Sequence, residues 1–157
     1  MRAGKTTCLW LIGSITFIAA FGVHADTVNY ILENVILDDS TQMNGTFSWT
    51  YTIGDFENGI GQFISLDIPY TSHDHTDLNA TIDAGQSIEI TLEGSVHDDG
   101  VDITLVLSQA LTPTTGSLIN LLTSKYEIGG NGFHTGVFKN GRISPVNDDV
   151  VFRNGFE

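Results

Sequence analysis

Cysteine is almost absent from this sequence of 157 residues, and the one cysteine, Cys8, lies close to the N-terminus. If the N-terminal segment is removed, as argued below, no cysteine remains. This excludes a disulfide framework, a thiol nucleophile and a cysteine-ligated zinc site. A domain without such crosslinks has to be stabilised by the packing of its core, and a chain of this length is long enough to bury one.

Basic residues are also scarce, with six Lys and Arg against nineteen Asp and Glu and a formal net charge of −13. Loss of Arg2 and Lys5 with the N-terminal segment would leave four basic residues against the same nineteen acids, a charge of −15. Nucleic acids and anionic lipid headgroups are bound through Lys and Arg, so neither is expected as a partner. The charge favours cationic partners or divalent ions, or it serves to keep an exported domain soluble.

Long apolar runs are limited to one, from residue 8 to residue 23, and two basic residues precede it. The run is interrupted by Gly, Ser and Thr, and it is shorter than the ~20 residues that a membrane-spanning helix needs. Small or tolerated residues up to Ala25 resemble a signal-peptidase site. We therefore expect export to the periplasm, the cell surface or the medium, with no membrane span left after processing. The expected organisation is a signal peptide (1–25), one folded domain (26–146), and a linker with a C-terminal tail (147–157).

Alternation of apolar and polar residues with a period of two is the main pattern in the remaining chain. In "TFSWTYTI", Phe47, Trp49 and Tyr51 alternate with hydroxyl side chains, and residues 87–93 and 101–108 repeat the scheme. Strands joined by short turns, without intervening helices, predict an all-β fold, specifically an antiparallel, jelly-roll-like β-sandwich. The aromatic row is expected in the core, and a platform for stacking sugar rings is the alternative.

Four dipeptides are predicted to form the turns between strands, because they supply the positive φ angles of tight hairpins. They are Asn44-Gly45, Asn58-Gly59, Asp99-Gly100 and Asn140-Gly141. The segment 117–127 leaves two alternatives open, a strand, which we favour, and a short helix.

The order of several segments resembles a family of small exported bacterial β-domains, many of which carry a PEP-CTERM sorting tail. The segments are "YILENVILDDS", "GTFSWTY", "DITLVLSQALTPTTGSLINL" and "SKYE…GVFKNGRISP", and the resemblance covers about residues 28–146. It implies a structural β-domain and brings no catalytic residues.

The C-terminus departs from that family. The Pro-Glu-Pro stretch, apolar helix and basic residues of a PEP-CTERM tail are missing from the sequence, which ends in "VFRNGFE". This ending resembles a Phe-x-x-Gly-Phe-Glu terminus found on exported proteins of some Gram-negative bacteria. The resemblance implies a shared step of export or surface handling, and the alternative is an ordinary frayed chain end.

The stretch "YTSHDHTD" offers a candidate metal site at His73 and His75. Residues at i and i+2 share a face of an extended chain, so both imidazoles could reach one transition metal ion. A third ligand would come from Asp77, His97 or His134. The alternative is a solvated connecting loop.

A second candidate lies in "HDDGVD", where Asp98, Asp99 and Asp102 present the carboxylate oxygens that calcium prefers. The D-x-D-x-D-G spacing of a calcium loop is absent from the sequence, and a hairpin turn explains Asp99-Gly100 equally well. No cofactor is expected, and bound calcium is the alternative.

Motifs of the common enzyme classes are missing from the sequence, including the G-x-S-x-G elbow, the phosphate-binding glycine loop and H-E-x-x-H. We therefore expect a non-catalytic protein, a structural or adhesive component of the cell surface or extracellular matrix. The first alternative is a module that binds polysaccharide or calcium, and the second is a small secreted hydrolase. A surface polysaccharide or protein is the expected partner.

Overall fold

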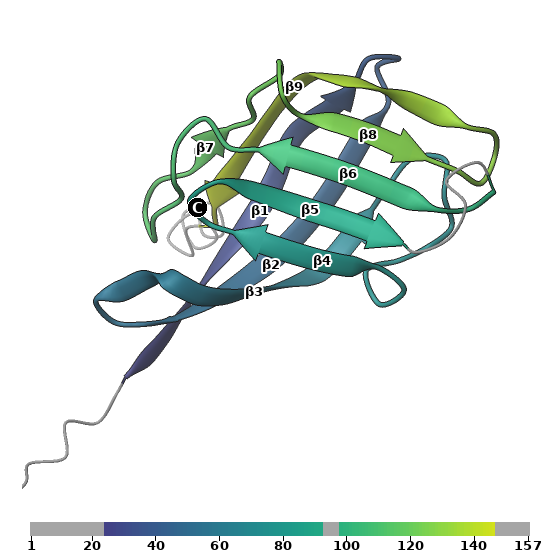
Figure 1. The fold of residues 1–157 in the computed structure, drawn as a ribbon. Coiled ribbons are helices and arrows are strands. Elements are labelled where there is room, and N and C mark those ends of the chain that lie inside the picture. The colour runs from purple at the N-terminus through teal and green to yellow at the C-terminus, as the bar shows by residue number, and fades with distance from the viewer. Residues whose placement is uncertain (1–23, 93–97, 147–157) are drawn as a thin grey trace, which may run out of the picture.

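The computed structural model describes residues 24–92 and 98–146, and within these ranges the chain forms nine β-strands and no helix. The predicted all-β fold is confirmed. Most of the predicted signal peptide, and the tail at 147–157, lie outside the described residues. The strands are β1 (Ala25–Leu37), β2 (Gln42–Thr52), β3 (Asp55–Asp67), β4 (Asn79–Asp83), β5 (Ser87–Leu92), β6 (Val101–Val106), β7 (Ser117–Leu118), β8 (Lys125–Ile128) and β9 (His134–Pro145) (Figure 1).

All described strand pairs are antiparallel, as predicted, and they follow one path, β3-β2-β1-β9-β8-β6-β5-β4, with β7 added beside β9. The long strand β9 joins the two halves, because residues 134–137 pair with β8 and residues 138–145 pair with β1. At the ends of the path β3 also contacts β4, so the sheet nearly closes into a barrel (Figure 1). The finer prediction of a two-sheet, jelly-roll-like sandwich is not confirmed, since one continuous sheet encloses the core.

The core consists of the apolar rows that the alternation predicted. Phe47 and Trp49 are 0 % and 2 % exposed, while Thr50 points outward. The Phe47 ring stacks on Tyr30 at 5.1 Å between centroids and meets Phe63 edge-on at 5.6 Å. The prediction of an aromatic core is thus confirmed for Phe47 and Trp49, whose burial excludes them as a sugar platform.

Three of the four predicted turn dipeptides lie inside strands, so that part of the prediction is wrong. Asn44-Gly45 belongs to β2, Asn58-Gly59 to β3 and Asn140-Gly141 to β9. The turn between β2 and β3 is instead made at Gly54, whose φ is +89°. A Cβ at Gly59 would lie 2.5 Å from the Trp49 indole, so this glycine provides room for a neighbouring ring. Asp99 alone lies in a turn as predicted, just before β6.

The ambiguous segment 117–127 is neither one strand nor a helix. The short strand β7 pairs with β9, a turn follows at residues 121–123, and β8 begins at Lys125. The Ser124 hydroxyl accepts a hydrogen bond from the Val106 amide at 2.9 Å, which ties this turn to β6.

Candidate functional site

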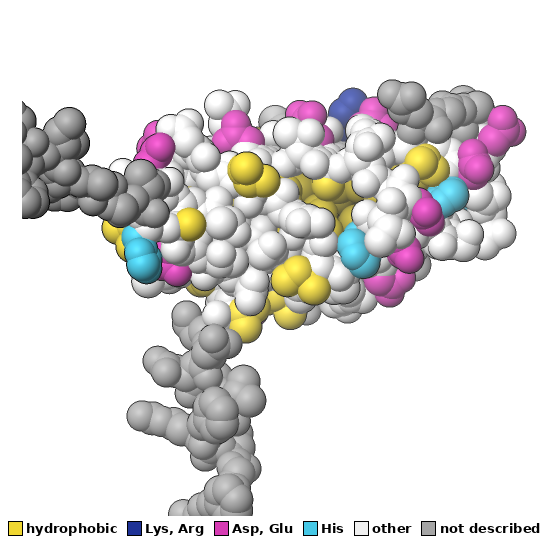
Figure 2. Space-filling view, turned by 90° about the horizontal axis from the view of Figure 1, so that it is seen from below, with side chains coloured by type: hydrophobic (Ala, Val, Ile, Leu, Met, Phe, Trp, Pro, Cys, Tyr) yellow, Lys and Arg dark blue, Asp and Glu magenta, His cyan; other side chains and the backbone are white. Residues whose placement is uncertain are grey.

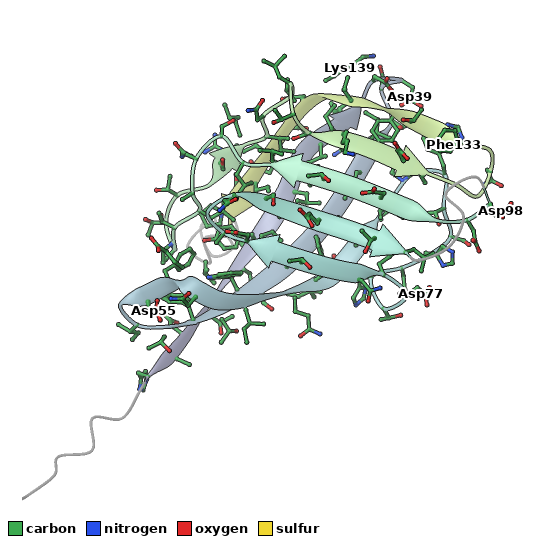
Figure 3. The ribbon with its side chains drawn as sticks, in the orientation of Figure 1. Asp39, Asp55, Asp77, Asp98, Phe133 and Lys139 are labelled. Atoms are coloured by element: carbon green, nitrogen blue, oxygen red, sulfur yellow. The ribbon has the colours of Figure 1, made fainter. Side chains whose placement is uncertain are left out.

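Two regions of the barrel gather chemistry-bearing side chains, and they lie at opposite ends. Figure 3 shows Asp39, Asp77, Asp98 and Phe133 along one end, and Asp55 at the other. We call the first region the loop end; it consists of residues 38–41, 68–78, 98–100 and 129–133. The second lies beside the β2–β3 hairpin.

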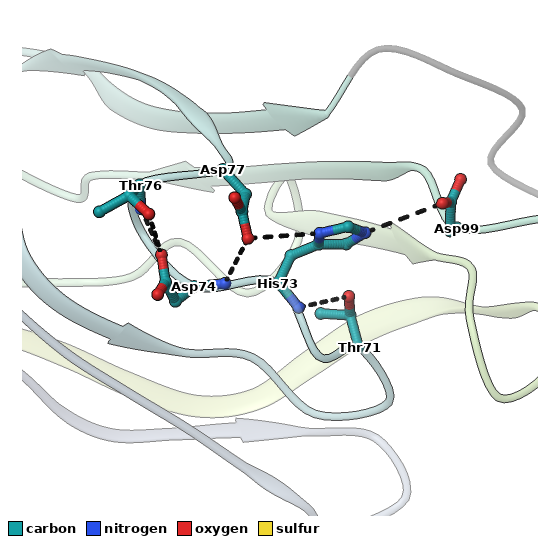
Figure 4. Close-up of polar contacts among 6 residues, drawn as sticks. All are labelled: Thr71, His73, Asp74, Thr76, Asp77 and Asp99. Atoms are coloured by element: carbon teal, nitrogen blue, oxygen red, sulfur yellow. Dashed lines mark hydrogen bonds and ion pairs between the residues drawn. The ribbon is translucent and has the colours of Figure 1, made fainter.

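At the loop end His73 stands between two carboxylates (Figure 4). Its Nδ1 lies 3.6 Å from Oδ2 of Asp77, and its Nε2 lies 3.9 Å from Oδ2 of Asp99. The side chains of Asp77 and Asp99 are 54 % and 68 % exposed, so both contacts are well solvated. Within residues 24–92 and 98–146, no three His, Cys, Asp or Glu side chains are placed to hold one metal ion.

The other predicted metal ligands lie elsewhere. His75 lines a separate hollow of about 380 Å³ with Phe63 and Leu78, where β3 approaches β4. Asp102 lies on β6, paired with Glu127 of β8, and Asp98 uses its backbone carbonyl to accept a hydrogen bond from Gly130. The structure therefore brings His73 close to Asp99 and Asp77. Among the described residues it gathers neither the ligands proposed with His73 and His75 nor the three aspartates of the calcium candidate around one metal position. Figure 2 shows the β3–β4 side, with hydrophobic side chains along its middle and acidic ones mainly toward its edges.

Of the two remaining candidate ligands, His97 lies outside the described residues. The ring of His134 stacks on Tyr70 at 3.6 Å between centroids and 4° between planes. Tyr70 has a φ of 72°, unusual for a residue with a side chain, and its carbonyl accepts a hydrogen bond from Asn131. Sequence reasoning missed Tyr70, because its stacking partner is 64 residues away. The stack joins the loop after β3 to the start of β9.

Hydrogen bonds hold the loop end together. The Tyr126 hydroxyl donates to Oδ1 of Asp38 at 2.5 Å, and burial, together with this hydrogen bond, raises the pKa of Tyr126 well above its usual value. Lys139 donates to the Ser40 hydroxyl at 3.1 Å. Contacts of this kind fix the loops in place, and they explain most of the polar side chains here as structural.

Asp74 gives a prediction for this end. It accepts hydrogen bonds from the side chain and the backbone amide of Thr76, at 2.5 and 2.7 Å, and these lower the pKa of the Asp74 carboxyl below its usual value. In the variant Thr76→Val the side-chain hydrogen bond is lost, so we expect the Asp74 pKa to rise toward the ordinary value of about 3.9. An NMR titration of the carboxyl carbon measures this.

The sign of the pH effect follows from the same hydrogen bonds. A carboxyl whose pKa is depressed in the folded state stabilises the fold above its unfolded pKa, and this stabilisation is lost as the pH falls through the folded pKa. Thr76→Val should therefore reduce the loss of stability in that acidic window. Thr41→Val is the matched control for the titration. Thr41 makes the same two bonds to Asp39, so this variant should leave the Asp74 pKa unchanged. An unchanged Asp74 pKa in Thr76→Val would contradict the assignment.

The second region is an open groove, which we call the hairpin groove. It consists of two adjoining hollows of about 680 and about 300 Å³ that share Phe56 and Glu57. Small-molecule sites commonly have volumes of about 300–1,000 Å³. The larger hollow is lined by Asp26, Tyr51, Ile53, Gly54, Asp55, Phe56, Glu57 and Pro113, and the smaller by Phe56, Glu57, Asp83, Ala84, Gly85, Gln86, Ala110 and Leu111.

Rigid strands position the aromatic wall of this groove. Tyr51 is the last aromatic residue of the β2 row and is only half-buried, and its ring meets Phe56 edge-on at 4.8 Å. The buried indole of Trp49 donates from Nε1 to the Phe56 carbonyl at 2.9 Å, which fixes the start of β3. The sequence pattern placed Tyr51 in the core with Trp49, and it did not single out Phe56.

All the charged side chains of the lining are acidic. Asp26, Asp55, Glu57 and Asp83 contribute carboxylates, and the lining residues include no Lys, Arg or His. The Tyr51 hydroxyl donates to Oδ2 of Asp26 at 3.2 Å, and desolvation and this negative charge raise the pKa of Tyr51. Sequence reasoning missed the acidic lining, because its residues come from strands far apart in the chain.

Comparison with family models, with curated proteins and with solved structures finds no match to this chain. The resemblance to exported bacterial β-domains therefore stays a prediction. In the part of the chain that the structure describes, there is no helix with the length and hydrophobicity to cross a bilayer.

Proposed function

We propose that this chain is an exported, non-catalytic domain that acts as a structural or adhesive component of the cell surface or extracellular matrix, and that it holds a polysaccharide in the hairpin groove. The observation that carries the proposal is the half-buried ring of Tyr51, set beside Phe56 and next to carboxylates in the same groove. Aromatic rings offer flat apolar contact area, and carboxylates accept hydrogen bonds from sugar hydroxyls.

Export is supported by the N-terminal sequence and by the resemblance described above. In this proposal residues 1–25 are removed as a signal peptide, and the tail at residues 147–157 is recognised during export or at the cell surface. Cleavage after Ala25 would place the new N-terminus at Asp26, which lines the hairpin groove.

Binding is tested by affinity electrophoresis of the processed protein in gels that contain different polysaccharides. We expect retardation by at least one of them, and we expect Tyr51→Leu to weaken it about threefold to tenfold, the value of one aromatic contact. Phe133→Leu is the matched control, because Phe133 is 41 % exposed at the opposite end of the barrel.

Two outcomes would contradict the proposal. One is an absence of retardation with every polysaccharide, and the other is an equal loss in Phe133→Leu. Incubation of the protein with the retarding polysaccharide also tests the hydrolase alternative, because new reducing ends would show that the domain is catalytic.

A further inference from the structure

We infer that the polysaccharide in the hairpin groove is cationic, a polymer of amino sugars whose free ammonium groups meet the groove's carboxylates. The inference rests on the proposed function and specifies its ligand. Its basis is the combination, in one concave site, of an aromatic wall with acidic side chains on both sides of Phe56.

No basic side chain of the described residues compensates the charge of the groove. The three Lys and Arg of the described residues, Lys125, Lys139 and Arg142, all lie on β8 and β9, and none lines the groove. An α-ammonium at Asp26 after processing would offset one of the four carboxylates. Like charges in a shared hollow repel one another, so a cation that enters it is attracted by several carboxylates at once.

The carboxylates retain capacity to bind a ligand. Asp55 accepts a hydrogen bond from Asn58 through Oδ1, and Asp83 accepts one from the Gly85 amide through Oδ1. Among the described residues, no hydrogen bond is donated to Oδ2 of these two groups or to the Glu57 carboxylate. Ammonium groups donate three hydrogen bonds and form stronger, charge-assisted bonds with carboxylates than hydroxyls do.

The aromatic wall favours amino sugars over other cationic ligands. A protonated amine near the Tyr51 and Phe56 rings is favoured by their negative faces, and the apolar face of a pyranose adds contact area. A flexible amine chain without sugar rings would gain only the attraction between its ammonium groups and the aromatic rings. At the aromatic wall, an N-acetylated sugar would gain only the contact of its apolar pyranose face.

The test compares three tetramers by isothermal titration with the processed protein: β-1,4-linked glucosamine, its N-acetylated form, and lysine. At a pH of about 5.5 sugar amines are protonated and carboxylates are ionised. We expect glucosamine tetramer to bind about tenfold or more tightly than either of the others at about 20 mM salt, and this advantage to shrink at about 500 mM salt.

A double variant, Asp55→Asn with Glu57→Gln, removes two charges while keeping size. We expect it to weaken binding of the glucosamine tetramer about fivefold or more. The N-acetylated tetramer, whose hydroxyls make only uncharged hydrogen bonds to these side chains, should lose less than half as much affinity. Asp67→Asn with Glu89→Gln is the matched control, because these exposed acids lie on β3 and β5 outside the groove.

Each failure has its own meaning. Equal or tighter binding of the N-acetylated tetramer overturns the inference and leaves the proposed function standing. Equal or tighter binding of the lysine tetramer also overturns it, because the sugar ring would then contribute nothing. If no tetramer binds and no polysaccharide retards the protein, the inference and the proposed function both fail.

Discussion

Replacing Phe47 with alanine is expected to lower the free energy of unfolding by about 3–5 kcal/mol, the usual cost of removing a buried aromatic ring. Phe47 is completely buried, and its ring lies between those of Tyr30 on β1 and Phe63 on β3. The variant would leave a cavity at the centre of three neighbouring strands. Typical domains have a total stability of only about 5–15 kcal/mol, so the loss should be plain in a denaturant titration.

Trp49 reports this unfolding directly. It is the one tryptophan outside the predicted signal peptide, and it is 2 % exposed, so its emission should shift to longer wavelength on unfolding. Ile60→Ala is the control, because Ile60 is 76 % exposed on β3 and its truncation should cost less than about 0.5 kcal/mol. Equal costs for Phe47→Ala and Ile60→Ala would show that these aromatic rings do not form the core.

The strands and their buried faces could be predicted from the sequence, because the side chains of a strand alternate between its two faces. Residues 101–107 illustrate this, since Val101, Ile103, Leu105 and Leu107 are all buried as expected. The near closure of the sheet could not be predicted. It depends on β9 running unbroken through Asn140-Gly141, where the dipeptide alone predicted a turn.

The candidate metal site at His73 and His75 shows a different limit of prediction from sequence. The i, i+2 rule that placed His73 and His75 on one face holds for an extended strand. The segment instead turns at residues 75–77, where Asp74 accepts hydrogen bonds from Thr76. The His73 imidazole therefore lies beside Asp77 and Asp99, and the His75 imidazole lines the hollow between β3 and β4. Short-range hydrogen bonds of Asp and Thr compete with extended structure in this way.

The hairpin groove lay beyond sequence reasoning because its lining spans residues 26–113. Only the pairing of β1 with β2, and of β2 with β3, brings Asp26, Tyr51 and Phe56 together. The local pattern did contain a hint, since the aromatic row on β2 continues to Tyr51 at the end of the strand. A row that runs past the core leaves its last ring partly exposed.

Gly59→Ala is expected to lower the free energy of unfolding by about 1–3 kcal/mol, the usual cost of overpacking. The added Cβ would lie 2.5 Å from the Trp49 indole and 2.8 Å from the Thr50 carbonyl oxygen. The indole is buried and bonded to the Phe56 carbonyl, so it has little freedom to move aside. We therefore expect a shift in the emission of folded Trp49 as well as a lower denaturation midpoint.

This double readout distinguishes the two roles that a glycine after asparagine can have. In a tight turn, alanine at Gly59 would destabilise the fold through a positive φ and leave the indole unaffected. In β3, alanine at position 59 would destabilise the fold by its steric contact with the Trp49 indole, so stability and emission must change together. Gly85→Ala is the control, because its Cβ would meet only the Asp83 carboxylate, at 3.3 Å, and neither quantity should change by much. Destabilisation of Gly59→Ala without any change in Trp49 emission would show that steric contact with the indole is not the reason for this glycine.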